Sequence, residues 1–180
     1  MKTRIIVVAS LCAALWLTPS LAWAQGQTSS ATLAVTANVE GAISLTFVAN
    51  ASGVTLGGAG TNTATLAFGT VSASTPPPTH VTETVGATSF TVSTPFDVEV
   101  TKSNVTSANY ALTAELATAD AVNGWEIDTF PLTALPAAGT SLTVTGVYTT
   151  AVTHTLFLTI PFTEGAAVIS NTIDFIATAN

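Results

Sequence analysis

A stretch of strict alternation at residues 31–39 limits most strongly what this chain can fold into. One side of the stretch carries Leu33, Val35, Ala37 and Val39, and the other carries Thr32, Ala34, Thr36 and Asn38. Successive side chains of a β-strand leave opposite faces of the sheet, so this period of two is typical of a half-buried strand. The sequence therefore predicts that the folded domain begins with a β-strand.

Residues 1–24 have the features of an export signal. Lys2 and Arg4 supply a positive start, residues 5–17 form an apolar run too short to span a bilayer comfortably, and residues 22–24 (Ala-Trp-Ala) offer a small-x-small cleavage site. We therefore expect an exported protein, located in the periplasm, at the cell surface or outside the cell, from which this segment is cleaved.

After the signal we expect a flexible leader at residues 25–30 and a single domain at residues 31–180. Cys12 is the only cysteine of the chain and lies inside the signal, so we expect no disulfide. Leu11 before it does not suit lipoprotein cleavage, which argues against a lipid anchor. No apolar run after the signal is long enough for a transmembrane helix.

The charge of the expected mature chain excludes two classes of partner. Ten acidic side chains and a single basic one, Lys102, follow the signal, which gives a net charge of −9. Nucleic acids and anionic lipids are bound by clusters of basic residues. The sequence therefore predicts neither a nucleic-acid-binding nor a lipid-binding protein.

The alternation of apolar and polar residues recurs along the chain, with turn-forming residues between the repeats. Residues 49–63 are rich in glycine and predict a loop, Pro76, Pro77 and Pro78 predict a stiff connector, and residues 117–122 carry only a weak helical pattern. Beyond residues 31–39, strands are expected at 43–47, 66–68, 88–93, 96–101, 110–116, 125–129, 142–146, 155–162 and 172–179. This spacing predicts an all-β sandwich of about eight to ten strands.

The sequence offers no catalytic, cofactor-binding or metal-binding motif. His80 and His154 lie in no metal-spaced or triad-like pattern, and we interpret them as ordinary loop or surface histidines. Glu126 and Asp128 are expected on one strand face, where a solvated acidic face is the preferred interpretation over a bound cation. Trp125 could stack on a sugar, but we predict that it packs into the core.

Both ends of the domain resemble a known family. The segment L-A-V-T-A-N-V-E-G-A-I-S-L at residues 33–45 resembles the mature N-terminus of alpha-type (colonisation-factor-like) chaperone–usher pilins. The closing T-I-D-F-I-A-T-A-N at residues 172–180 is similar to the last strand of pilin-like and spore-coat-U-like secreted β-sandwiches. The resemblance implies an incomplete immunoglobulin-like antiparallel β-sandwich and a non-enzymatic subunit of an extracellular fibre.

The same resemblance implies roles for the two ends. Residues 31–39 would enter a groove on the next subunit and fill it with Leu33, Val35, Ala37 and Val39. A periplasmic chaperone would occupy that groove beforehand, along a C-terminal strand that contains Ile173, Phe175 and Ala177. The implied partners are thus like subunits and a chaperone.

Two other functions stay open at the level of the sequence. The chain can be a self-contained secreted binding or coat module, in which residues 31–39 pair within their own sheet and loops 49–63 and 117–126 contact a ligand. A hydrolase with an unrecognised site is the less favoured alternative. Deleting residues 25–40 distinguishes the first from a fibre subunit, because only the subunit should lose its ability to polymerise.

Overall fold

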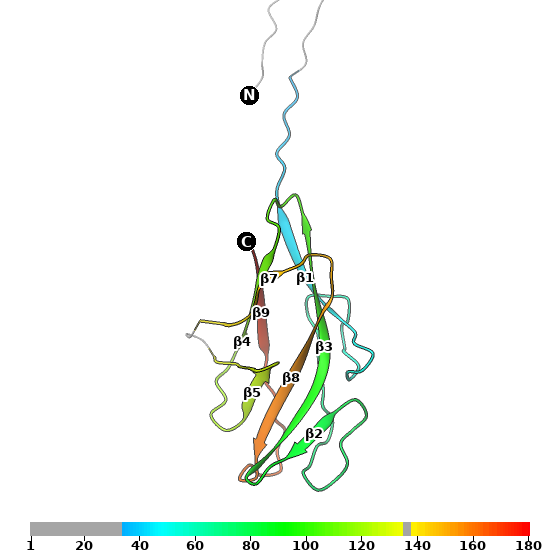
Figure 1. The fold of residues 1–180 in the computed structure, drawn as a ribbon, viewed down its shortest axis with the longest axis vertical. Coiled ribbons are helices and arrows are strands. Elements are labelled where there is room, and N and C mark those ends of the chain that lie inside the picture. Colours follow the sequence, from blue (N-terminus) through cyan, green and yellow to red (C-terminus); the bar gives the residue numbers. More distant parts are fainter. Residues whose placement is uncertain (1–33, 135–137) are drawn as a thin grey trace, which may run out of the picture. The chain divides into compact units, whose positions relative to one another are not determined.

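The structure is a computed structural model that describes residues 34–134 and 138–180. Contacts between residues divide the chain into two units, residues 1–37 and residues 38–180. Of the first unit, only residues 34–37 are described, and they are exposed and form no strand. All strands described below belong to the second unit (Figure 1).

The described part of the chain is built from β-strands and contains no helix. None of its segments is therefore a helix able to cross a membrane. In chain order the nine strands are β1 (Ala42–Val48), β2 (Thr82–Val85), β3 (Ser89–Ser103), β4 (Tyr110–Leu116), β5 (Gly124–Ile127), β6 (Phe130–Pro131), β7 (Thr140–Gly146), β8 (Val152–Pro161) and β9 (Ile173–Ala179).

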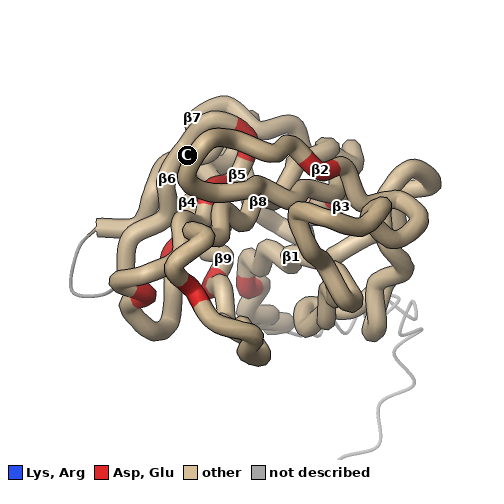
Figure 2. The backbone as a smooth tube through the Cα atoms, turned by 90° about the horizontal axis from the view of Figure 1, so that it is seen from below, with Lys and Arg blue, Asp and Glu red and all other residues tan. Residues whose placement is uncertain are grey.

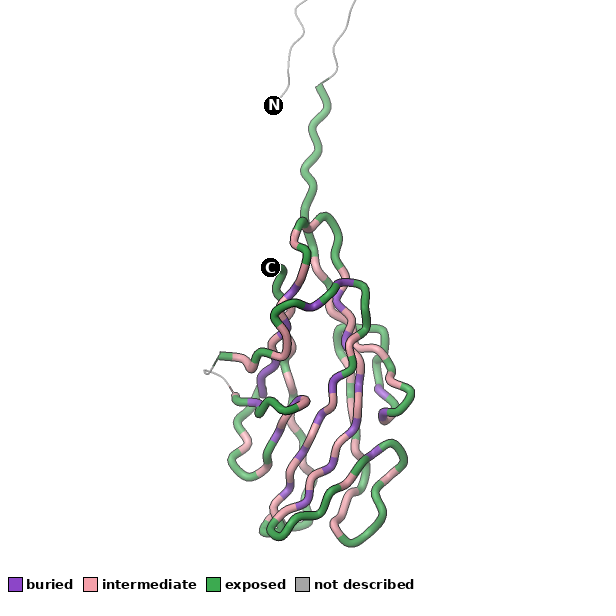
Figure 3. Tube along the Cα trace, in the orientation of Figure 1, coloured by how far each residue is buried: buried purple, intermediate pink, exposed green. Residues whose placement is uncertain are grey.

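The strands form two antiparallel sheets that share one core. The larger sheet has the order β1-β3-β8-β5-β6, with β2 also paired to β3, and the smaller sheet has the order β7-β4-β9. Buried residues alternate with less buried ones along β3 and β8 (Figure 3). The rings of Phe96 and Phe175, one from each sheet, lie 5.9 Å apart between the sheets. The predicted all-β sandwich is confirmed, and its immunoglobulin-like type stays a prediction.

Strand β3 is longer than the sequence suggested. Two strands were expected at 88–93 and 96–101, but the structure joins them into one strand that contains Pro95. Proline has no backbone N–H, so it is rarely tolerated where both edges of a strand are paired. On one edge β3 pairs with β2 up to Ser93 and with β1 from Asp97 onward, and Pro95 lies between these two partners. Its missing N–H therefore breaks no strand pairing on that edge.

Two predicted strands are not strands in the structure. Residues 34–39 of the expected strand 31–39 have no strand pairing, and residues 31–33 lie outside the described residues. The expected strand at 66–68 is extended chain next to an isolated bridge between Gly57 and Thr65. Alternation predicts which side chains point inward, but a strand also needs a hydrogen-bonded neighbour.

Candidate functional site

An apolar cavity of about 680 Å³ opens between the two sheets of the second unit. The larger sheet contributes Phe47, Phe96, Trp125, Leu156, Leu158 and Ile160 to its lining. Residues 64–71 contribute a second part of the lining and residues 167–173 with Phe175 a third. The cavity is therefore enclosed by the larger sheet, by residues 64–71, and by the segment that leads into β9 of the smaller sheet.

The cavity lies at the end of the sandwich that is distant from the start of β1. Along the β1–β3 ladder, Ala42 pairs with Ser103 and Val48 pairs with Asp97. Among β1 residues, Phe47 near the far end of the ladder lines the cavity. The β8 lining residues 156–160 pair with β3 residues 90–94, which lie farther along β3 in the same direction. The cavity therefore extends from Phe47 away from the start of β1, and residues 42–46 of β1 do not line it.

Three phenylalanine rings of the cavity lining contact one another. Phe175 of β9 makes edge-on contacts with Phe47 at 5.2 Å and with Phe96 at 5.9 Å between ring centroids. Phe47 and Phe96 lie 6.4 Å apart. Such tilted arrangements are favourable for aromatic pairs, so the cluster connects β1, β3 and β9 within the cavity lining.

Residues 64–68 and residues 169–177 both show the alternating burial of a strand, but within the described part of the chain neither segment has a strand partner on its cavity side. In residues 64–68, Ala64, Leu66 and Phe68 are half-buried and their neighbours are exposed. In residues 169–177, the odd-numbered residues are half-buried and the even-numbered ones are exposed. β9 is the last strand of its sheet, so among the described residues no strand pairs with its cavity-side edge.

The site residues predicted from the sequence fall in three places. Ile173 and Phe175 line the cavity, whereas Ala177 packs against the core outside the lining. Val35 and Val39 are 79% and 69% exposed, and Ala37 is exposed as well. Leu33 lies outside the described residues. The structure thus places part of the predicted C-terminal strand at the cavity and leaves the described part of residues 31–39 unpaired.

The sequence did not reveal that residues 64–71 form a wall of this site. Leu66, Phe68 and Val71 contribute apolar side chains to it. The sequence predicted a short strand at residues 66–68, but nothing in it indicated which part of the protein this strand would face. Phe47 and Phe96 lie in strands that the sequence predicted, at 43–47 and 96–101, but nothing identified them as cavity residues.

Trp125 packs into the core, as predicted. Its side chain is largely buried, and its indole N–H donates a hydrogen bond of 2.9 Å to the Asp120 carboxylate. The weak helical pattern at 117–122 corresponds to a turn, in which the Asp120 carboxylate also accepts from the N–H groups of Val122 and Asn123. Burial alone would raise the pKa of Asp120, but the hydrogen bonds from Asn123, Trp125 and Val122 lower it to about 2.

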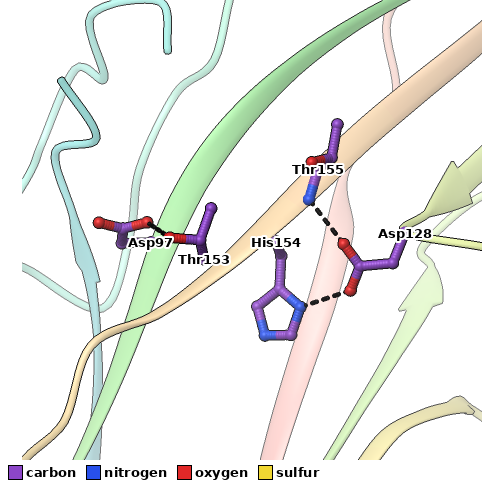
Figure 4. A network of polar contacts seen from close by, with 5 residues as sticks. All are labelled: Asp97, Asp128, Thr153, His154 and Thr155. Carbon is purple, nitrogen blue, oxygen red and sulfur yellow. Dashed lines mark hydrogen bonds and ion pairs between the residues drawn. The ribbon is translucent and has the colours of Figure 1, made fainter. Parts of the chain in front are cut away.

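A second buried polar contact corrects two predictions (Figure 4). His154 is not a surface residue but lies in β8, only 4% exposed. Its Nδ1 is 2.8 Å from Oδ2 of Asp128, whose Oδ1 accepts from the Thr155 N–H at 2.8 Å. Asp128 does not lie on the strand face of β5 but follows it, with a φ of 58°. The Asp128 carboxylate therefore fastens the β5–β6 turn to β8.

His154 has no nucleophilic partner among the described residues. Its Nε2 is buried and makes no hydrogen bond, and its ring lies 6.0 Å from that of Phe96. His80, in contrast, is an exposed residue of a turn, as the sequence suggested. The Asp128–His154 pair therefore has the geometry of a structural anchor.

The remaining charges are dispersed. Figure 2 shows acidic residues on several separate strands and loops. In the part of the chain that the structure describes, no three histidine, cysteine or acidic side chains gather as they would around a metal ion. Lys102 donates a hydrogen bond to the Ser107 carbonyl and lies over the Tyr148 ring at 4.7 Å.

Comparisons with known proteins found no matching family model, no similar curated protein and no similar solved structure. Function is therefore inferred from the residues and geometry of this chain alone.

Proposed function

We propose that this protein is a non-enzymatic, pilin-like subunit of an extracellular fibre, and that subunits assemble when residues 31–39 of one molecule fill the cavity of the next. The observation that carries the proposal is the apolar cavity of about 680 Å³ beside the unpaired edge of β9. An added strand satisfies both features at once, because its backbone pairs with the edge and its alternate side chains enter the cavity.

Residues 31–39 have the chemistry that such a site requires. Every second residue is apolar, and the segment contains no charged residue and no proline. Val35 and Val39 are largely exposed in the structure, so they are available to a second molecule. Burying these side chains in the cavity removes apolar surface from water on both molecules, which favours association by about 25 cal/mol for each Å².

The arrangement of the strands supports an incomplete sandwich. In an immunoglobulin sandwich, strands A, B, E and D form one sheet, and strands C and F with the last strand G form the other, which C′ extends in variable domains. The order β1-β3-β8-β5 is the order expected for A-B-E-D, and the order β7-β4-β9 is the order expected for C′-C-F. The chain departs from that order because β5 precedes β7. No described strand takes the place of G beside β9, and this is where the cavity lies.

The geometry favours exchange between molecules over insertion of the segment into its own cavity. If residues 31–39 folded back onto β1 of their own molecule, the shortest turn that keeps their apolar face inward would span residues 40–42. This turn would pair Val39 with Ile43 and Val35 with Phe47. A two-residue turn would place the opposite face inward. Phe47 is where the cavity begins, so a segment folded back along β1 would not fill it. A contact of this head-to-tail kind generates filaments.

The other components of the proposal follow from the sequence. Residues 1–24 would direct export, and the fibre would be found outside the cell. An open apolar cavity in a subunit that is not yet assembled invites aggregation, so we propose that a periplasmic chaperone covers it before assembly.

The test uses the chain without residues 1–24 and two variants of the same segment. Val35→Asp would bury an unpaired carboxylate in the cavity, which costs several kcal/mol, and about 4 kcal/mol corresponds to roughly a thousandfold weaker association. Thr36→Asp is the matched control, because its side chain faces the other side of the strand. We expect SDS-resistant ladders from the parent chain and from Thr36→Asp, and none from Val35→Asp.

Two results would contradict the proposal. One is a ladder from Val35→Asp that equals that of the parent chain. The other is a parent chain that stays monomeric by light scattering at all concentrations and is no more stable than a chain without residues 25–40. A monomer that binds small apolar probes in the cavity would instead support a secreted binding module, because the cavity volume suits such ligands.

A further inference from the structure

We infer that residues 165–170 form a strap that folds over the mouth of the cavity when the cavity is occupied, and that Val168 then becomes buried against the occupant. The inference concerns how an occupant is retained, and it holds for any apolar molecule that fills the cavity. It rests on the cavity itself and not on strand exchange. The strap belongs to the connection between the end of β8 and the start of β9 (Figure 1).

The strap is fixed at both ends. Before it, the Phe162 N–H donates to the Thr88 carbonyl at 2.9 Å, and the Phe162 ring stacks on that of Phe90 with 6.3 Å between ring centroids. After it, the side-chain amide of Asn171 donates to the Thr118 carbonyl at 2.8 Å. Movement of this connection is therefore confined to the residues between the two anchors.

The strap itself is only weakly held. Within the described part of the chain, no backbone group of residues 165–170 makes a hydrogen bond to another backbone group. Residues 165–168 are exposed and Ile169 is half-buried. A Cβ added to Gly165 would meet no atom within 4 Å, so the backbone there has open space around it. Few hydrogen bonds and little burial are the features of a segment that rearranges at a low cost in free energy.

The strap lies at the cavity and carries apolar side chains. Its residues 167–170 belong to the cavity lining. Val168 is 95% exposed, and it is the one exposed large apolar residue, among those that the structure describes, that also lines the cavity. The strap contains no charged residue. Folding over an apolar occupant would therefore remove Val168 from water without burying a charge.

The other chain segment that lines the cavity, residues 64–71, is held more firmly. Thr65 and Gly57 exchange two backbone hydrogen bonds, of 3.0 Å and 2.8 Å. Leu66 and Phe68 pack against the hydrophobic core. The cavity is thus bordered by one segment that is pinned and by one that is free to close.

The release of an apolar dye tests the role of Val168. Nile red, which is uncharged, is the probe, because a cavity of about 680 Å³ suits a ligand of that size. The test uses the chain without residues 1–24 that carries Val35→Asp, so that residues 31–39 do not compete for the cavity. Val168→Ser is compared with Val144→Ser, a change at a valine of β7 that is 63% exposed and does not line the cavity.

We expect Val168→Ser to release the dye about tenfold faster on dilution, since burial of a valine side chain is worth about this factor. Val144→Ser should leave the release rate unchanged. Both valines are exposed, so neither change should impair folding. Equal release rates from the two variants would overturn the inference, and so would a chain that does not bind the dye, because the strap would then have nothing to close over.

Amide hydrogen exchange gives a second measurement on the same chain. Residues 165–170 should exchange rapidly without dye, and saturating dye should slow their exchange roughly tenfold as the strap closes. Exchange that the bound dye leaves unchanged would overturn the inference.

These outcomes are separate from those of the proposed function, because the dye binds a single molecule. Ladders from the parent chain together with unchanged exchange at residues 165–170 would refute the strap and leave strand exchange intact. Slowed exchange with dye in a chain that forms no ladder would support the strap and refute the fibre.

Discussion

The buried contact between Asp128 and His154 allows a quantitative test of what stabilises the sandwich. We consider the substitution Asp128→Ala, which removes both carboxylate oxygens. His154 Nδ1 and the Thr155 N–H each lose a partner at 2.8 Å. The change also places alanine at a φ of 58°, a left-handed conformation that aspartate tolerates better than alanine.

The expected loss of stability is the sum of three effects. Both hydrogen bonds are accepted by a carboxylate, and a bond to a charged group contributes about 1.5–3 kcal/mol, while the left-handed backbone costs about 1 kcal/mol. The side chain of Asp128 is 36% exposed, so water can replace part of what is lost. We therefore expect Asp128→Ala to lower the free energy of unfolding by about 3 kcal/mol, a large part of the 5–15 kcal/mol typical of a domain.

Urea denaturation at neutral pH measures this value, and two variants serve as controls. Asp128→Asn keeps one acceptor oxygen and a residue that tolerates the left-handed backbone, so it should lose only about 1 kcal/mol. Asp97 accepts from the Thr153 hydroxyl (Figure 4) and from the Asn50 side-chain amide, each at 2.7 Å. The bond to Thr153 is exposed to water and no left-handed backbone is involved, so Asp97→Ala should lose about 1 kcal/mol. A loss at Asp128→Ala no larger than at Asp97→Ala would refute the role of the anchor.

Three further changes test other parts of the fold. The pKa of Asp120 is lowered to about 2, so the ionised carboxylate should stabilise the fold above pH 4 and lose this effect as the pH falls toward 2. We expect the free energy of unfolding to fall by about 1–2 kcal/mol over this range, after allowance for the exposure of the side chain. Urea titrations of Asp120→Asn should lack this loss at acid pH. Trp125→Phe removes one hydrogen bond to Asp120 and should cost about 1 kcal/mol by urea denaturation; no loss would show that the indole N–H contributes nothing. In Gly146→Ala the added methyl group would collide with the Tyr110 ring, so thermal unfolding should show a loss of about 1–3 kcal/mol, and an unchanged midpoint would contradict the packing.

The sequence was sufficient to predict the strands that bury one face against the core. Residues such as Val98 in β3 and Leu158 in β8 alternate with polar residues because one side of each strand faces the core. The final strand around Phe175 follows the same rule and was predicted correctly. The sandwich could therefore be predicted from local pattern alone, without knowledge of which strands pair.

The site could not be predicted to the same extent, because its features depend on distant partners. The burial of His154 becomes favourable through Asp128, which is 26 residues away and reaches it from a left-handed turn. The wall at residues 64–71 depends on Gly60 and Thr61 bonding to Phe47. Alternation gives the orientation of a side chain relative to its strand, whereas these contacts depend on which segments meet in space.

The position of Pro95 bears on how the protein avoids unwanted self-association. Between the end of the β2 pairing at Ser93 and the start of the β1 pairing at Asp97, one side of β3 has no strand neighbour. Unpaired backbone groups at such a gap are a template for edge-to-edge aggregation. Proline in the middle of the gap offers no N–H to a foreign strand, and the Thr94 hydroxyl is already bonded to the Val54 N–H and the His80 carbonyl. A proline at this point of a long central strand therefore leaves this stretch of β3 without an N–H that a strand of another molecule could bond to.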